Sequence, residues 1–184
     1  MSYTEYSMND IVPDVVDVVP PGKLMAIYAE DITVKPGNKL TPTQVKDPPH
    51  ISWIEDDDGT SLHTLLMVDP DAPSPEDPKF REVLHWFVIN IPGQLVEDGQ
   101  IVAEYVGAGP PKETGLHRYV FLVFKQSREI KEELYIDKFT GSGRLNFNTR
   151  VYANQYDLGF PIAGNYFLAQ YDDYVPIRNA QFVG

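Results

Sequence analysis

Three residues that could bind a ligand stand in stretches rich in Pro and Gly. Asp69 opens the segment DPDAPS, His85 lies in LHW, and His117 lies in GLHRY, which follows the segment GAGPP at 107–111. Pro and Gly fix the backbone shape where a side chain or a ligand has to be presented. Imidazole and phenol groups can donate hydrogen bonds to a phosphate-like group, and glycines let a ligand approach the backbone closely. These segments predict the walls of one small anion pocket.

Strand geometry indicates how these residues meet. Alternate residues of a strand point to the same face, so His117 and Tyr119 share one side of their strand. Asp69 ends an apolar run and His85 begins one, so all of them emerge near strand ends, where loops gather. A carboxylate at Asp69 would raise the imidazole pKa values and select tautomers by hydrogen bonding. That would make both histidines better anion donors near neutral pH.

The same residue types leave other interpretations open. A histidine on a strand is often a hydrogen-bonded structural residue, and Asp69, His85 and His117 also form an acceptable ligand set for a catalytic metal ion. Arg118 is either a phosphate ligand or the partner of a buried carboxylate. The remaining two histidines lie outside the segments framed by Pro and Gly, so we expect them to be structural or exposed.

Composition restricts the class of protein. The chain has 184 residues, a formal net charge of -12 and no Cys. Repulsion by so acidic a chain argues against nucleic acid or an anionic bilayer as the partner, and without Cys there is no disulfide or thiolate chemistry. No apolar stretch approaches the roughly 18 residues of a membrane span. We therefore predict one domain over residues 1–184, soluble and cytoplasmic, with no integral membrane segment and no cofactor.

Short apolar runs bounded by Pro, Gly or Asp dominate the chain and are typical of strands. They are rich in β-branched and aromatic residues, which favour extended backbone. The expected strands are 24–28, 50–54, 63–68, 84–91 and 119–124. Asp58-Gly59 predicts a tight hairpin between the second and third of these strands, because both residues tolerate positive φ. The whole pattern predicts an antiparallel β-sandwich.

Two helices are expected beside the strands. Ser7 and Asp10 could cap a short N-terminal helix. Asn148 is a good N-cap for a second helix over 149–158, and Gly159 suits the position after its end.

Four segments resemble the two signature regions of the phosphatidylethanolamine-binding protein family, also called Raf kinase inhibitor proteins. They are DPDAPS, PKFRE leading into LHW, GAGPP, and GLHRYVF. The resemblance runs from NDIVP near the N-terminus to YDDYVP near the C-terminus, which is essentially the whole chain. It implies a mainly β fold, a Greek-key antiparallel β-sandwich with a few short peripheral helices, and a surface pocket for phosphate-bearing headgroups.

The resemblance also implies pocket residues position by position. They are Asp69, Asp71, Pro73, His85, Gly109, Pro110, His117 and Tyr119. It further implies cis peptide bonds at Ala72-Pro73 and, unusually for a non-proline bond, at Arg81-Glu82. The C-terminal DDYVP segment favours an animal-type member. Asn179 stands where mammalian members place a tyrosine near the pocket mouth, so this part of the pocket is expected to differ.

The function implied by the resemblance is binding without catalysis, so we expect the protein not to be an enzyme. The pocket would accept the phosphate of a phosphatidylethanolamine-like headgroup or of a phosphorylated side chain, and the protein would modulate kinase signalling by engaging a protein kinase. The alternative is a serine protease inhibitor that uses an exposed loop or terminus. A histidine-based metalloenzyme is a second alternative, whereas the leading interpretation expects no metal.

Overall fold

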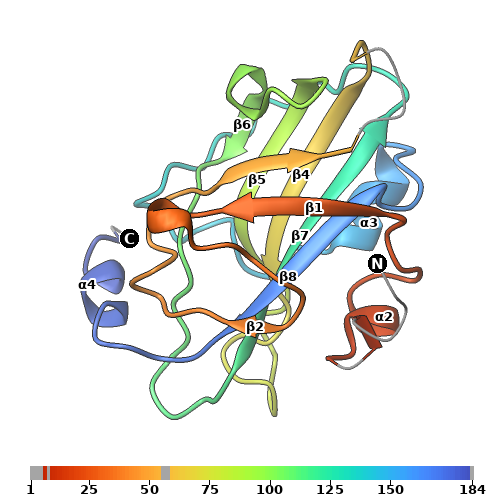
Figure 1. Ribbon diagram of the computed structural model, residues 1–184. Helices are drawn as coiled ribbons and strands as arrows, with labels where there is room; N and C mark the ends of the chain where they lie inside the picture. The colour runs from red at the N-terminus through yellow and green to blue at the C-terminus, as the bar shows by residue number, and fades with distance from the viewer. Residues whose placement is uncertain (1–5, 8, 55–58, 183–184) are drawn as a thin grey trace.

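The computed structural model describes residues 6–7, 9–54 and 59–182 (Figure 1). Its helices are short, and the helices and strands are named here as in Figure 1. In chain order they are α2 (Ile11–Asp14), β1 (Gly22–Ile27), η1 (Ala29–Asp31), β2 (Asn38–Lys39), β3 (His50–Trp53), β4 (Leu62–Asp69), β5 (Val83–Pro92), η2 (Val96–Asp98), β6 (Gln100–Ala103), β7 (His117–Gln126), α3 (Thr149–Gln155), β8 (Ala163–Ala169) and α4 (Val175–Asn179), where η marks a 3-10 turn.

The strands form one curled sheet in the order β3-β1-β8-β7-β4-β5-β6, and β2 also pairs with β8. Most pairs are antiparallel, but β8 runs parallel to both β1 and β2. Figure 1 shows β1 crossing in front of β4, β5 and β7 as the sheet curls over. The prediction of a mainly β fold with a few short helices is confirmed. The Greek-key description of the sandwich stays a prediction.

Apolar side chains fill both faces of the central strands. In β4, Leu65 and Met67 belong to one buried cluster, whereas Leu66 and Val68 belong to the other. This alternation follows from the two-residue period of a strand. The first cluster includes residues of β1 and β3, and the second includes residues of α2 and α3. The central strands are therefore packed from both sides, and they support the residues at their ends.

All five predicted strands are present, with ends within two residues of the prediction. The sequence patterns did not predict β2, β6 or β8. The last of these lies in the middle of the sheet, yet it begins with Ala and Gly, which are poor strand formers. A Cβ atom at Gly164 would lie 3.0 Å from the Pro20 Cγ atom and 3.1 Å from the Tyr6 hydroxyl oxygen. Close packing, rather than strand propensity, explains the small residues of β8.

The hairpin predicted at Asp58-Gly59 is wrong in its strand pairing. β3 pairs with β1, and β4 pairs with β5 and β7, so the strands on either side of this turn are not neighbours in the sheet. Asp58 lies outside the described residues, whereas Gly59 has the expected positive φ of 76°. The Asp-Gly pair indicates a local turn, but it does not determine which strands become neighbours in the sheet.

Both predicted helices are present near the expected positions, but α3 is shorter than predicted and α2 lacks the predicted side-chain cap at Asp10. The Asn148 side chain caps the first turn of α3 as expected, but α3 ends at Gln155 because Asp157 adopts a left-handed φ of 53°. Asp157, not Gly159, therefore follows the helix end, in an arrangement of the Schellman type. α2 is a single turn, and Asp10 makes no side-chain cap there. Within the described ranges, no helix has the length and apolar character needed to cross a membrane.

Candidate ligand-binding pocket

The ends of β4, β5 and β7 border a pocket of about 370 Å³, called here the main pocket. β4 runs antiparallel to both neighbours, so the end of β4 meets the starts of β5 and β7 at one edge of the sheet. The predicted residues that line the pocket are Asp69, Pro73, His85, Gly109, His117 and Tyr119. The lining also includes residues that were not predicted from the sequence as ligands, among them Phe80, Gly141, Arg144, Leu145, Arg178 and Phe182.

Asp69 and His117 form a buried hydrogen-bonded pair. Asp69 Oδ2 accepts from His117 Nδ1 over 3.0 Å, and Asp69 Oδ1 accepts from the Asp71 N–H over 2.7 Å. The other ring nitrogen of His117, Nε2, lies 2.9 Å from the Thr114 hydroxyl oxygen. Both ring nitrogens therefore have partners within the protein. His117 is therefore held between Asp69 and Thr114, and it has no free donor for a ligand.

His85 has one ring nitrogen bonded to the backbone. Its Nδ1 lies 2.7 Å from the Val106 carbonyl oxygen, and Nδ1 must donate because a carbonyl can only accept. Burial, followed by the positive charge of Arg178, lowers the pKa of His85 to about 3. The neutral ring then carries its hydrogen on Nδ1, and Nε2 is an acceptor for which no described residue is a partner. The expectation that Asp69 raises the His85 pKa and makes the ring an anion donor is wrong.

Tyr119 is fully buried among aromatic rings. Its ring stacks on Phe167 with 5.1 Å between centroids, and it meets His85 edge-on, also at 5.1 Å. Burial, followed by the charge of Asp69, raises the pKa of Tyr119, so the hydroxyl keeps its hydrogen at neutral pH. The hydroxyl oxygen accepts a long hydrogen bond of 3.4 Å from the Gly109 N–H. The phenol is therefore a fixed neutral group at the pocket wall.

Arg178 of α4 brings an unexpected positive charge to the main pocket. Its Nε donates to the Gly107 carbonyl over 2.9 Å, and its Nη1 donates to the Asn179 side chain over 2.8 Å. The Phe182 ring centroid lies 4.9 Å from its Cζ atom. Among the described residues, no carboxylate pairs with Arg178 and nothing accepts a hydrogen bond from its Nη2. The guanidinium is held in place with donors to spare.

Arg144 contributes a second positive charge and is only 3% exposed. Its guanidinium donates to backbone carbonyls, including those of Leu84, Glu104 and Asp137. Burial lowers the pKa of Arg144 to about 10, which still leaves it charged at neutral pH. In the part of the chain that the structure describes, it has no carboxylate partner. Arg144 follows Gly143 in a loop whose other residues are mostly exposed, and no sequence pattern identifies this arginine as a pocket residue.

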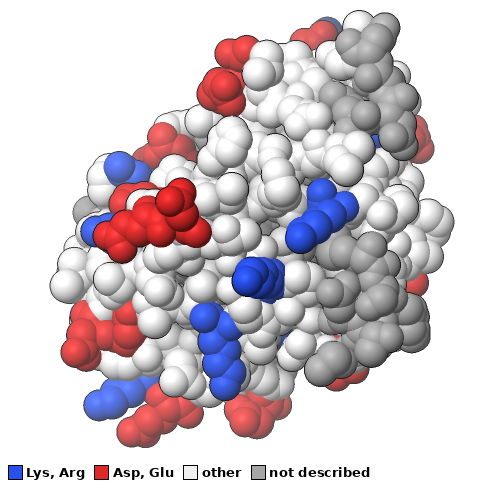
Figure 2. Space-filling view, viewed as in Figure 1, with Lys and Arg blue, Asp and Glu red and all other residues white. Residues whose placement is uncertain are grey.

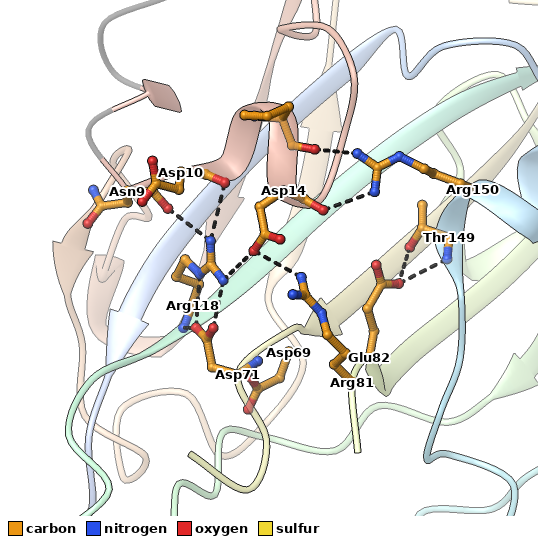
Figure 3. Close-up of polar contacts among 11 residues, drawn as sticks. Asn9, Asp10, Asp14, Asp69, Asp71, Arg81, Glu82, Arg118, Thr149 and Arg150 are labelled. Carbon is orange, nitrogen blue, oxygen red and sulfur yellow. Dashed lines mark hydrogen bonds and ion pairs between the residues drawn. The ribbon is translucent and has the colours of Figure 1, made fainter. Parts of the chain in front are cut away.

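Asp71 points away from the main pocket and binds Arg118 (Figure 3). Its Oδ2 accepts from the backbone N–H and Nε of Arg118, and its Oδ1 accepts from Nη2. The other donors of Arg118 bind the Asn9 and Asp10 carbonyls and the Asp14 carboxylate. Of the two interpretations of Arg118, the partner of a buried carboxylate is therefore confirmed. All of its donors are used, so it has none for a phosphate.

Figure 3 shows that this network extends to α2 and α3. Arg81 binds the Asp14 carboxylate at 2.9 Å, and Arg150 donates to the Asp14 carbonyl, also over 2.9 Å. The adjacent Glu82 carboxylate accepts from the backbone N–H and the hydroxyl of Thr149. Burial raises the pKa of Glu82. These contacts tie α2 and α3 to the loop between β4 and β5.

Comparison with known proteins identifies the family. A family model described as phosphatidylethanolamine-binding protein matches residues 30–167. The chain belongs to the phosphatidylethanolamine-binding protein family. The resemblance inferred from the four sequence motifs is thereby confirmed.

The chain is similar to proteins that carry different descriptions. A Drosophila melanogaster protein described as "Putative odorant-binding protein A5" is 38% identical over 169 residues, which is 91% of this chain and 79% of the relative. The structure described as "CG7054 solution structure" is 57% identical, with a TM-score of 0.79 over 96% of this chain and 100% of that chain. A carboxypeptidase Y inhibitor, solved in complex with its cognate proteinase, is 27% identical, with a TM-score of 0.78 over 92% of this chain and 94% of that chain.

Several positions implied by the family resemblance can be placed in the structure. The cis bonds at Ala72-Pro73 and Arg81-Glu82 are both present, and Val12-Pro13 is a further cis bond. Pro110 is buried, and its neighbour Pro111 lines the main pocket instead. Asn179 does lie at the main pocket, where its side chain accepts from Arg178. In this chain Arg178, the residue before Asn179, supplies the larger side chain at the main pocket.

The metal-site alternative finds no support in this geometry. Asp69 and His117 bind each other, and His85 binds a backbone carbonyl. Among the residues that the structure describes, no group of three or more His, Cys, Asp or Glu side chains is placed to hold a metal ion.

Proposed function

We propose that the main pocket binds the phosphate of a small ligand, either a phosphatidylethanolamine-like headgroup or a phosphorylated side chain. The observation that carries this proposal is the Arg178 guanidinium, which has free donors and no carboxylate partner among the described residues. Arg144 adds a second charge, while Asp69 is already bonded to His117. The lining therefore has an excess of positive charge, which favours an anion. Arginine also matches the geometry of phosphate oxygens.

His85 adds a second requirement for the ligand. His85 lines the main pocket, and its Nε2 is an acceptor for which no described residue is a partner. A ligand that brings a hydrogen-bond donor would satisfy it. The ammonium of phosphoethanolamine and the hydroxyl of a monoprotonated phosphate both supply such a donor. The two requirements together favour an anion that also carries an acidic hydrogen.

The rim of the main pocket is suited to a ligand that continues beyond its phosphate. Phe80 and Leu145 line the pocket and are 36% and 47% exposed. These apolar groups could contact the hydrocarbon part of a lipid or the residues next to a phosphorylated side chain. Engagement of a phosphorylated partner would allow the protein to modulate kinase signalling in the cytoplasm. The proposal is for binding without catalysis.

Isothermal titration calorimetry with phosphoethanolamine tests the proposed function. The wild-type protein is expected to bind the ligand, whereas His85→Ala and Arg178→Leu should each lose roughly tenfold or more in affinity, since each removes a polar contact worth at least about 1.4 kcal/mol. His50→Ala is the matched control, because His50 is exposed and lies outside the main pocket. Circular dichroism of every variant checks the fold. Unchanged affinity in both pocket variants would refute the assignment.

Protease inhibition is a second candidate because a relative of similar fold is described as a carboxypeptidase Y inhibitor in complex with its cognate proteinase. Such inhibition would use an exposed loop or terminus of this chain and a serine protease as partner. Activity assays of carboxypeptidase Y and of other serine proteases, with and without the protein, decide the question. The His85→Ala variant should inhibit as well as the wild type if the surface used lies outside the main pocket. Absence of any rate change removes this candidate.

A further inference from the structure

A second hollow of about 390 Å³ adjoins the main pocket, and the proposed function does not use it. We call it the side pocket; its lining includes Lys46, Lys138, Tyr174, Arg178, Gln181 and Phe182. Arg178 and Phe182 line both hollows, so these two residues form part of the wall between them.

The side pocket concentrates positive charge in an acidic protein. Of its described lining residues, Lys46, Lys138 and Arg178 are cations, and Asp47 is the one carboxylate. Neither lysine forms an ion pair with any described residue. The whole chain carries a formal charge of -12, so such a cluster is contrary to its overall charge. Cations gathered in a hollow raise the local concentration of anions.

Neutral donors accompany these charges. Burial raises the pKa of Tyr174, so its hydroxyl is protonated at neutral pH. The Tyr174 hydroxyl and the Gln181 side-chain amide make no hydrogen bond with a described residue. Hydroxyl and amide donors next to cations suit a carboxylate or a phosphate. The chemistry of the side pocket is therefore that of an anion subsite.

Arg178 connects the two hollows chemically. Its Nε is fixed on the Gly107 carbonyl, next in sequence to Val106, which holds His85. A planar guanidinium presents donors along more than one edge, so one Arg178 can serve two anionic groups. We infer that the ligand of this protein carries a second anionic group besides its phosphate, and that the side pocket binds this group. The inference rests on the proposed function of the main pocket.

Two probes that differ by a single carboxylate test the inference. O-Phosphoserine is phosphoethanolamine with one added carboxylate, so both place the same phosphate and ammonium in the main pocket. O-Phosphoserine is expected to bind the wild-type protein roughly five- to tenfold more tightly in calorimetry, as for a few partly exposed charge pairs. The gain should shrink at high salt because the lysines are exposed.

Variants localise the gain to the side pocket. The double variant Lys46→Ala/Lys138→Ala should bind phosphoethanolamine as the wild type does, but lose the preference for O-phosphoserine. Figure 2 shows Lys and Arg side chains on another part of the surface, over β1 and β2. The exposed lysines of those strands, Lys23 and Lys39, provide the matched control, because Lys23→Ala/Lys39→Ala changes the net charge equally. This control should keep the preference.

The outcomes separate the two proposals. If phosphoethanolamine binds and O-phosphoserine binds no more tightly, or if the preference survives in Lys46→Ala/Lys138→Ala, the side-pocket inference is overturned while the proposed function stands. If neither probe binds, both fall. A further arm identifies the source of the ligand: glycerophosphoserine, a phosphodiester, represents a lipid headgroup, whereas O-phosphoserine represents a free phosphate monoester. The side-pocket subsite is supported if either probe binds more tightly than the matching ethanolamine compound, which lacks the carboxylate.

Discussion

Arg118 holds both carboxylate oxygens of Asp71: its Nη2 donates to Oδ1 over 2.6 Å, and its Nε donates to Oδ2 over 2.9 Å. The same guanidinium binds Asp14 of α2, so the pocket loop and the N-terminal segment share one cation. Asp71 lies two residues after Asp69, yet it belongs to this charge network and not to the lining of the main pocket. Stability and ligand binding should therefore respond differently to changes at Asp71.

Replacement of Asp71 by Ala is expected to lower the free energy of unfolding by roughly 2–4 kcal/mol, because it leaves the Arg118 charge largely buried with only Asp14 as a carboxylate partner. Urea unfolding measures this loss. Asp77→Ala is the control: its carboxylate is 72% exposed and lies 3.8 Å from Lys79, so its removal should change little. Phosphoethanolamine affinity should stay near the wild-type value in Asp71→Ala, and a tenfold loss would contradict this assignment.

His85 should make stability depend on pH in a defined direction. Its pKa is about 3 in the folded protein and near 6.5 in an unfolded chain, so between these values the unfolded state binds more protons. Stability from this residue is complete above about pH 6.5 and is lost as the pH falls toward 3. Urea unfolding of wild type and His85→Gln at several pH values measures the difference. The wild type should lose more stability on acidification, and equal losses would disprove a depressed pKa.

Gly109 should matter because of the space that Arg178 occupies. A Cβ atom at Gly109 would overlap the Arg178 guanidinium, so the guanidinium would have to move. Gly109→Ala is expected to weaken phosphoethanolamine binding by roughly tenfold with a small change in stability. Gly141→Ala is the matched control in the same lining, since its Cβ would meet only Phe182 at 4.0 Å. Calorimetry that finds equal losses in both variants would argue against a role for the Arg178 position.

Thr149 should stabilise the buried Glu82 carboxylate at the start of α3. Its hydroxyl donates to Glu82 Oε2 over 2.6 Å, so Thr149→Val is expected to cost roughly 1–3 kcal/mol at neutral pH. The hydroxyl bond favours the ionised carboxylate, so the cost should decrease as the pH falls through the raised pKa of Glu82. Urea unfolding at pH 7 and pH 4 tests this. Thr43→Val removes a similar but exposed hydrogen bond to Asp172 and serves as the control.

Local sequence patterns determined much of the architecture. Short runs of β-branched and aromatic residues bounded by Pro, Gly or Asp predicted five strands with nearly correct ends, because strand propensity and turn residues are local properties. The start of α3 was also predictable, since an Asn side chain caps the helix that follows it directly. Segments of Pro and Gly indicated where the strand ends meet, and the motifs they contain identified the family.

Tertiary structure alone decided the chemistry of the main pocket. Burial sets the neutral state of His85, and the Val106 carbonyl sets its tautomer. Arg118 binds the Asp71 carboxylate, although Asp71 lies only two residues after Asp69. Arg178 lies about seventy residues from Gly107, the residue that fixes its position, and no local pattern connects them. The central strand β8 was missed because packing selects its small residues. Desolvation and contacts between distant segments depend on the assembled fold, so a sequence read locally can name candidate residues but not their roles.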